Sequence, residues 1–459
     1  MVEWHRMTAL EHGRAIGAAT IDPVALAEHY LGRIRAADPD HAIYLRITEG
    51  RALAEAKSAR LRAKAGSRLG PLDGVPISWK DLFDSAGTVT TAGSALLKDR
   101  IPARDATVLA RASRAGLVCL GKTNMTEFAF SGLGINPTFG TPANSFDVTT
   151  RRVPGGSSSG AAVSVARGLA AAAIGSDTGG SVRIPAAWNG LVGLKTTAGL
   201  LPLDGVLPLS PTFDTVGPLA RDVADANALF GVLAARLPAD LAGTTLKDAR
   251  LVIPTDHVFD RVGANVGAAF EAAVATLARA GATIIRESVP EFAEAKALIA
   301  EHGVLAAIEC DAAWRTTIAK DPKSVFHMVR TRIEPGAKAS GYDVIKLHEG
   351  FARLTRQFAI RLAGCDAMIA PTVPDDPPEI APLLADDQAY LHANAMSLHN
   401  TVPGNWFGCS ALTIPCGGMT LPVGLMLMQR AHHEGQLLRL GAAAERALAG
   451  VPKPILPLS

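Results

Sequence analysis

Two short clusters of glycine and serine could each place a hydroxyl group beside a bound ligand. They lie in GGSSSGAAVSVARGLAAAAIGSDTGGSVRIP, residues 155–185, and an alanine-rich segment separates them. Glycine lets the backbone approach a ligand closely, and serine offers a hydroxyl that can act as a nucleophile. Two such clusters predict one site assembled from two loops. Its chemistry could be phosphate binding or cleavage of an acyl bond, unless the small residues serve only packing.

A phosphate-binding loop is one interpretation of a nearby segment. GLVCLGKT at 116–123 matches the pattern G-x-x-x-x-G-K-T, which would make Lys122 and Thr123 ligands of phosphate and magnesium. The four residues between the two glycines are Leu, Val, Cys and Leu, which are typical of a buried strand. We therefore expect a strand here, and tight ATP binding would be the observation in favour of the nucleotide-binding alternative.

A nucleophile elbow is a second interpretation. GSSSG at 156–160 satisfies G-x-S-x-G, with Ser158 as the nucleophile. That motif needs a strand directly before it and a late histidine as base. The preceding TTRRVPGG is poor strand material, and His432 and His433 lie where the last helix is expected to begin. Serines that cap a helix starting near residue 159 are the structural alternative.

A lysine base is the third interpretation, and it uses both clusters. A serine hydroxyl is a weak nucleophile until a base takes its proton, and burial favours the neutral form of a lysine that could do so. Lys80 ends the apolar segment VPISW, where a lysine is otherwise poorly placed. The alternative is a surface lysine, and the adjacent Asp81 also fits a surface turn.

Five segments in order resemble the amidase signature family in sequence and spacing: GVPISWKD, GKTNMTEFAFSG, PGGSSSGAA, GSDTGGSVRIPA and GLVGLKTT. The resemblance runs from about residue 20 to the C-terminus and is densest from 70 to 220. It implies that Lys80 is the catalytic lysine, that Ser157 is a bridging serine after a cis peptide bond, and that Ser181 is the nucleophile. The first glycine–serine cluster would then place the bridging serine, and the second would place the nucleophile.

The resemblance also implies a mechanism. Neutral Lys80 accepts a proton from Ser157, which takes one from Ser181, and Ser181 attacks an amide carbonyl to form an acyl-enzyme. No metal and no organic cofactor are required. The oxyanion is expected to be held by the backbone N–H groups of Thr178, Gly179 and Gly180, with Ser181 as a further donor.

Charged residues flank the expected nucleophile. We interpret Asp177 and Arg183 as an ion pair that orients the turn, in preference to direct contact with substrate.

The residues that contact substrate are less clearly marked. FHMVRTRIEPG resembles the family segment V-x-x-R-I, whose arginine can meet a substrate carboxylate; Arg332 fits it better than Arg330, and a solvated helix face is the alternative. Trp406 in GNWFG is expected either at the mouth of the pocket or in the core. The same two alternatives, pocket wall or ordinary core, remain open for three residues of MTEFAF: Met125, Phe128 and Phe130.

A small-molecule amide is the expected substrate. The family alternative is the glutaminase component, the A chain, of the glutamyl-tRNA amidotransferase complex. Its tyrosine-rich segment is replaced here by HGVLAAIECDAAW, and its aspartate is absent near Leu398. Purification distinguishes the two, because a stand-alone amidase is active without partner proteins. An inactive scaffold with this fold is disfavoured because all three catalytic positions are filled.

The elements that position these residues fit one large domain of the α/β class. The 459 residues are 48% hydrophobic and 19% charged, which is ample for a sizeable core. A net charge of +2 without a basic cluster argues against nucleic acid or an acidic membrane surface as partner. Five scattered cysteines and a start without an apolar signal region predict a cytoplasmic protein; a homodimer remains open.

Strands and helices alternate along most of the chain. We expect a helical arm over 1–66, a catalytic core over 70–220, and the remainder of the core over 221–459 with a variable helical region at about 290–363. Strands are expected at 74–81, in LVCLGKTN, and in several later segments such as RLVIP, ATIIRESVP and DAMIAPTVP. This alternation predicts a mixed, mostly parallel central sheet covered by helices on both sides, which is also the amidase signature fold that the resemblance implies.

Overall fold

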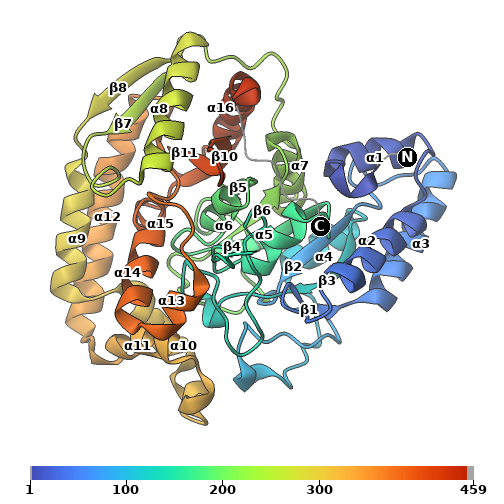
Figure 1. The fold of residues 1–459 in the computed structure, drawn as a ribbon, viewed down its shortest axis with the longest axis horizontal. Coiled ribbons are helices and arrows are strands. Elements are labelled where there is room, and N and C mark those ends of the chain that lie inside the picture. Colours follow the sequence, from blue (N-terminus) through green and yellow to red (C-terminus); the bar gives the residue numbers. More distant parts are fainter. Residues whose placement is uncertain (1–2, 148, 452–459) are drawn as a thin grey trace.

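Eleven strands form one mixed sheet that runs through the molecule (Figure 1). The structure is a computed structural model that describes residues 3–147 and 149–451. The strands follow the order β1-β3-β2-β4-β6-β5-β10-β11-β9-β7-β8 across the sheet. Their bounds are β1 Tyr44–Ile47, β2 Pro76–Lys80, β3 Val118–Thr123, β4 Ala172–Asp177, β5 Val192–Lys195, β6 Thr215–Ala220, β7 Arg250–Pro254, β8 Thr283–Glu287, β9 Ala367–Pro371, β10 Ser410–Gly417 and β11 Val423–Gln429.

Parallel pairing joins β2 to β3 and β4, and β7 to β8 and β9. The other neighbours pair antiparallel. The sheet is mixed, as predicted, but antiparallel pairs outnumber parallel ones, so "mostly parallel" is wrong. The difference arises where a strand returns beside its predecessor without a crossover helix, as β11 does after β10 and β6 does after β5.

Helices precede, separate and cover these strands. They are α1 Ala9–Gly17, α2 Pro23–Ala37, α3 Glu49–Lys64, α4 Thr107–Arg114, α5 Ser159–Ala166, α6 Arg183–Trp188, α7 Val223–Ala234, α8 Ala264–Arg279, α9 Pro290–His302, α10 Leu305–Ile318, α11 His327–Ile333, α12 Gly341–Ala363, α13 Ile380–Ala385, α14 Asp387–Leu398, α15 Val402–Trp406 and α16 Glu434–Ala447. The helical prediction for 290–363 is confirmed by α9 to α12. None of the helices described is long and apolar enough to cross a membrane.

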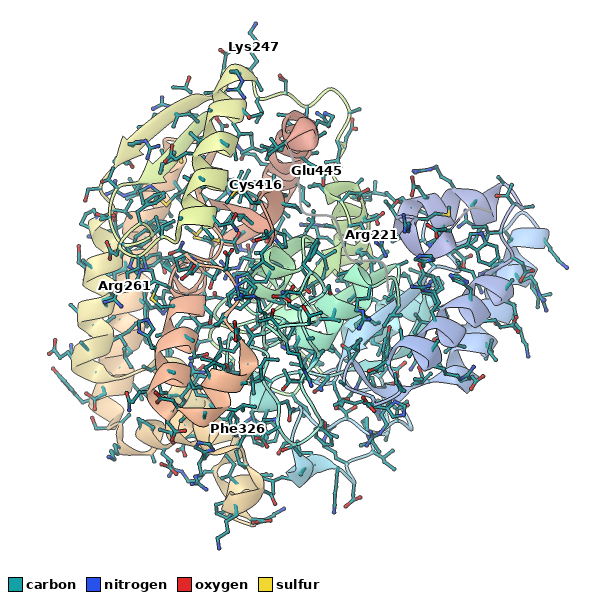
Figure 2. The ribbon with its side chains drawn as sticks, viewed as in Figure 1. Arg221, Lys247, Arg261, Phe326, Cys416 and Glu445 are labelled. Carbon is teal, nitrogen blue, oxygen red and sulfur yellow. The ribbon has the colours of Figure 1, made fainter. Side chains whose placement is uncertain are left out.

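Strand pairing and side-chain hydrogen bonds join the N-terminal helices to the rest of the molecule. The segment between α2 and α3 supplies β1, which pairs with β3. Arg221, which follows β6, lies between these helices and the centre of the molecule (Figure 2), where its guanidinium donates to the carbonyls of His5 and Val165 at 2.8 and 2.9 Å. Asp22 caps α2 by accepting from the N–H of Val24 at 2.8 Å, as its position before a proline predicts.

The alanine-rich helix α5 is buried along its whole length and packs on β2 and β4. Its small side chains permit close approach of neighbouring backbone. A Cβ atom added at Gly160 would lie 2.4 Å from the carbonyl oxygen of Ile43. The helix therefore fixes the distance between the two glycine–serine clusters within a tightly packed part of the core.

Candidate active site

Lys80 is the last residue of β2, in the interior of the sheet between β3 and β4. The side chain has no exposed surface. Its Nζ lies 2.7 Å from Ser157 Oγ and 2.8 Å from Ser176 Oγ. A protonated amine would donate to both hydroxyls, whereas a neutral amine could donate to Ser176 and accept the proton of Ser157. The lysine is therefore placed to exchange a proton with Ser157.

Burial lowers the pKa of Lys80 from 10.5 to about 7, because the charged ammonium loses its hydration. The carboxylates of Asp214 and Asp177 act in the opposite direction and hold the pKa above the value that burial alone would give. Near neutral pH a large fraction of Lys80 is thus uncharged. That is the state in which the amine can take a proton.

Ser157 and Ser181 come from the two glycine–serine clusters, and their segments lie side by side. The peptide bond between Gly156 and Ser157 is cis. The N–H of Ser158 donates to the carbonyl of Ser181 at 3.3 Å, which ties the two loops together. In the described part of the chain no hydrogen bond joins the two hydroxyls of Ser157 and Ser181. Proton transfer between them therefore requires at least one of the two side chains to move.

The turn before Ser181 is organised by a buried ion pair. Asp177 and Arg183 have fully buried side chains, and Arg183 donates from Nε and Nη2 to the two carboxylate oxygens at 3.0 Å each. Burial alone would raise the pKa of Asp177, but the charge of Arg183 and its hydrogen bonds hold that pKa below the usual range. Asn405 also contacts both partners, at 3.0 Å from Asp177 Oδ1 and 2.7 Å from Arg183 Nη2. This geometry fits the expected orienting role.

The amide groups of this turn are not equally available. The N–H of Gly180 donates to Asp177 Oδ1 at 2.8 Å. This N–H is therefore already engaged, contrary to the expectation that it donates to the oxyanion. Within the described residues, the N–H groups of Thr178, Gly179 and Ser181 make no hydrogen bond. Thr178, Gly179 and Ser181 also border a cavity. An anion next to Ser181 could therefore meet donors from three residues but not from Gly180.

A cavity of about 340 Å³ opens at Ser181. Arg332 is its one charged wall residue among those described, and burial lowers the pKa of this guanidinium. It donates to the carbonyl of Phe130 and lies 4.2 Å from the centre of the Phe130 ring. Most other wall residues are apolar, including Leu209, Phe213, Ile299, Val304, Leu305, Phe351, Leu398, Val402 and Trp406.

Some of the residues proposed for substrate contact border the cavity, and others lie in the core. Phe130, Arg332 and Trp406 border the cavity. Met125 and Phe128 do not: both are buried in the main core cluster, so they are core residues and not pocket walls as expected.

Arg330 also lies outside the cavity. It forms an ion pair with Glu334 at 3.2 Å and donates to the carbonyl of Pro322. Arg332 is therefore the arginine that a molecule beside Ser181 would meet.

The two other motif interpretations do not fit the geometry. Lys122 and Thr123 belong to the buried strand β3, as expected, and Lys122 Nζ lies 3.0 Å from Asp81 Oδ1. Asp81 is buried as well, so its interpretation as a surface residue is wrong. Ser158 is fully buried and donates to the carbonyl of Ser176 at 3.3 Å, away from the cavity walls.

Two polar residues near Lys80 were not found from the sequence. Ser176 stands in the quoted motif GSDTGGS, and the parallel pairing of β2 with β4 brings it beside Lys80. Asp214 Oδ1 accepts from Thr178 Oγ1 at 2.5 Å, and burial raises its pKa to about 6. The signal for Asp214 was only a lone acid in the apolar segment LSPTFDTVGPLA.

Comparison with known proteins gives a consistent result. The amidase family model matches residues 25–438. A 2-amino-5-chloromuconic acid deaminase from Comamonas testosteroni is 35% identical, over 97% of this chain and 98% of its own. The A chain of the glutamyl-tRNA(Gln) amidotransferase from Anaeromyxobacter sp. (strain K) is 34% identical over 98% of both chains.

Solved structures agree. A crystal structure of an amidase superposes with a TM-score of 0.86 at 30% identity, covering 96% of this chain and 100% of that one. The native peptide amidase from Stenotrophomonas maltophilia gives a TM-score of 0.81 at 27% identity, covering 99% and 100%.

Proposed function

The chain belongs to the amidase family of hydrolases acting on amide C–N bonds, and from this premise we propose that it cleaves a small-molecule carboxylic amide through an acyl-enzyme on Ser181. The observation that carries the proposal is the 2.7 Å contact between the buried amine of Lys80 and the hydroxyl of Ser157, next to the cavity at Ser181. A buried lysine without a carboxylate in contact has a low cost of becoming neutral, as a general base requires.

In the proposed reaction, the proton of Ser181 passes to Ser157 while the proton of Ser157 passes to Lys80. The freed Ser181 oxygen forms a bond to the amide carbonyl carbon. Collapse of the tetrahedral intermediate breaks the C–N bond, and the leaving amine takes the proton back through Ser157. Water then releases the acid by the same route in reverse.

The oxyanion of that intermediate would be stabilised by the free amides of Thr178, Gly179 and Ser181. Each well-placed donor of this kind contributes about 3 kcal/mol to transition-state stabilisation. Asp177 stabilises this turn because its carboxylate accepts hydrogen bonds from the N–H of Gly180 and from Nε and Nη2 of Arg183. We expect the carboxylate to position the turn without contacting substrate.

We propose that the substrate is largely apolar and carries a carboxylate. Arg332 borders the cavity, and no carboxylate in the described residues forms an ion pair with it. A half-buried guanidinium without a counterion favours an anionic ligand, because the ligand would balance its charge. The relative named for 2-amino-5-chloromuconic acid is consistent with an acidic substrate.

A panel of aliphatic, aromatic and carboxylated amides, assayed by ammonia release, tests this proposal. Ser181→Ala should abolish turnover. Ser159→Ala is the matched control, because Ser159 lies in the first glycine–serine cluster and its hydroxyl, among the described residues, donates only to the carbonyl of Asn124. A folded Ser181→Ala protein with wild-type kcat/KM would refute the assignment.

A second candidate is the glutaminase role of the amidotransferase A chain. It is favoured by the 34% identity to such proteins over nearly the whole chain. The apolar wall at Leu398 and Val402 argues for the stand-alone amidase, because a glutamine side chain needs more polar partners. Activity of the purified single chain would support the amidase, and activity that appears only with partner proteins would support the alternative.

A further inference from the structure

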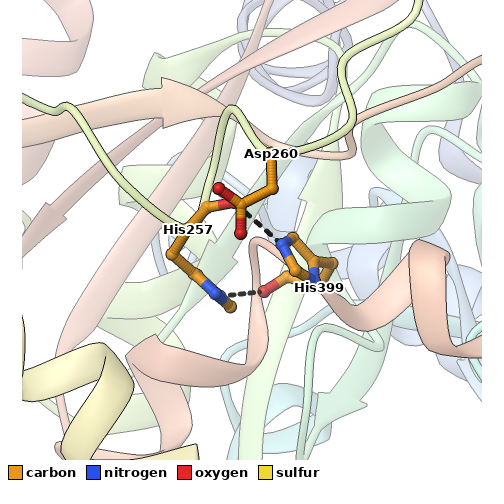
Figure 3. A group of neighbouring side chains, drawn as sticks. All are labelled: His257, Asp260 and His399. Carbon is orange, nitrogen blue, oxygen red and sulfur yellow. Dashed lines mark hydrogen bonds between the residues drawn. The ribbon is translucent and has the colours of Figure 1, made fainter.

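Two histidines and an aspartate converge on one another (Figure 3), and none of the three lines the cavity at Ser181. His257 and Asp260 lie in the loop between β7 and α8, and His399 directly follows α14. One ring nitrogen of each histidine and one carboxylate oxygen of Asp260 all lie within 4.8 Å of one another. Ligand atoms of one tetrahedral ion lie closer together than this, so the side chains of all three residues would have to adjust in order to share an ion.

The two histidines hold each other in place through the backbone. The Nε2 of His257 donates to the carbonyl of His399 at 2.9 Å, and the Nε2 of His399 donates to the carbonyl of His257 at the same distance. Their rings stack with centroids 4.1 Å apart. A ring nitrogen that donates to a backbone carbonyl is the usual second contact of a metal-binding histidine, since it fixes the tautomer and the orientation of the ring.

The other nitrogen of His257 has no partner. Its Nδ1 is buried and makes no hydrogen bond among the described residues. The residue is only 6% exposed, so this nitrogen is also shielded from solvent. Because Nε2 carries the proton, Nδ1 presents a lone pair. An unpaired buried acceptor is costly, and a bound cation would satisfy it.

The charges around the group set the class of ligand. Asp260 supplies a negative charge, while Lys296 on α9 and Arg261 on the same loop (labelled in Figure 2) oppose a cation. Two imidazoles and one carboxylate favour Zn²⁺ and its neighbours over Mg²⁺ or Ca²⁺, which prefer sets of oxygen ligands. We propose that His257, His399 and Asp260 bind a divalent transition-metal ion at a site separate from the Lys80 proton relay.

The site would connect two segments that meet near the proposed oxyanion turn. Thr401, two residues after His399, donates from Oγ1 to the carbonyl of Gly179 at 2.6 Å. A bound ion would tie this segment to the β7–α8 loop. It would therefore stiffen the support of the turn without contacting the substrate, and its role is structural.

Titration of the metal-free full chain with Co²⁺ tests the site by visible absorption, with Zn²⁺ competition as a second readout. We expect one equivalent to bind with a spectrum of nitrogen and oxygen ligands. His257→Gln and Asp260→Asn should each weaken binding by about tenfold or more. Because Asp260 is exposed, its variant keeps the test valid even if the His257 variant fails to fold.

His327→Gln is the matched control. His327 Nε2 lies 2.8 Å from Asp387 Oδ1, but this exposed pair is not part of a three-ligand group among the described residues. Its substitution should leave Co²⁺ affinity unchanged. Three results would overturn the proposal: no absorption in the wild type, equal affinity in the wild type and Asp260→Asn, or a thiolate charge-transfer band that places the ion on a cysteine.

Discussion

The acid limb of the pH profile is the sharpest consequence of a buried Lys80. An ordinary lysine with a pKa of 10.5 is neutral in roughly one molecule in 3,000 at pH 7. With its pKa lowered to about 7, about half of the enzyme carries the neutral amine. Burial therefore increases the active fraction by roughly 10³, and kcat/KM should fall about tenfold per pH unit below pH 6.

The same shift predicts a pH dependence of stability. The unfolded chain holds the Lys80 proton up to about pH 10.5 and the folded chain only up to about pH 7, so the unfolded state binds more protons between these values. Stability must therefore rise with pH across this window. From pH 7 to pH 9 the Lys80 contribution to the free energy of unfolding should increase by about 2 kcal/mol.

Two assays check these values. The first is kcat/KM for ammonia release between pH 5 and pH 9, which reports the free enzyme. The second is urea unfolding of the wild type and Lys80→Met at pH 7 and pH 9, where only the wild type should gain the Lys80 contribution. A kcat/KM profile that stays flat down to pH 5, or an equal change in stability for both proteins, would refute the reasoning.

Three further predictions concern the site and its support. Arg332→Gln should lower kcat/KM for carboxylated amides by about 10- to 100-fold, as for loss of a charged hydrogen bond, and leave uncharged amides and the Arg330→Gln control little changed. Ser176→Ala removes one contact of the lysine amine, so kcat should fall about tenfold with the fold intact by circular dichroism; unchanged kcat would contradict this. Gly180→Ala places a Cβ 2.2 Å from a hydroxyl oxygen and should cost about 1–3 kcal/mol in urea unfolding, whereas Gly32→Ala, which meets nothing within 4 Å, should not destabilise.

The sequence predicted the residues around Lys80 better than the walls of the cavity. The lysine and both serines lie in ordered motifs whose spacing is characteristic of one family. MTEFAF offered no such guide, because apolar side chains suit a core and a pocket equally. Phe128 has a φ of 48°, and its ring packs 4.9 Å from Trp314, while Phe130 borders the cavity. A turn of this kind cannot be read from hydrophobicity.

Long-range pairing accounts for most of what the sequence did not predict. Asp81 follows Lys80 directly, and a charged pair of neighbours suggested a surface turn. In the structure the two side chains have different partners: Lys80 contacts Ser157, and Asp81 contacts Lys122 at 3.0 Å on β3. The alternation of helices and strands predicted the class of the fold, but the antiparallel neighbours of β5 and β10 depend on contacts far apart in the sequence.

The cavity draws its walls from both the first and the second half of the chain, with Phe130, Leu209 and Phe213 among those from the first. The turn at Thr178, Gly179 and Ser181 comes from the glycine–serine clusters, whereas Ile299, Val304, Leu305, Arg332, Phe351, Leu398 and Trp406 come from the later helices and their connections. Bond cleavage and ligand choice can therefore diverge independently during evolution. An ancestral enzyme of this architecture could acquire new substrates by accumulating changes after residue 290 while its nucleophile remained untouched.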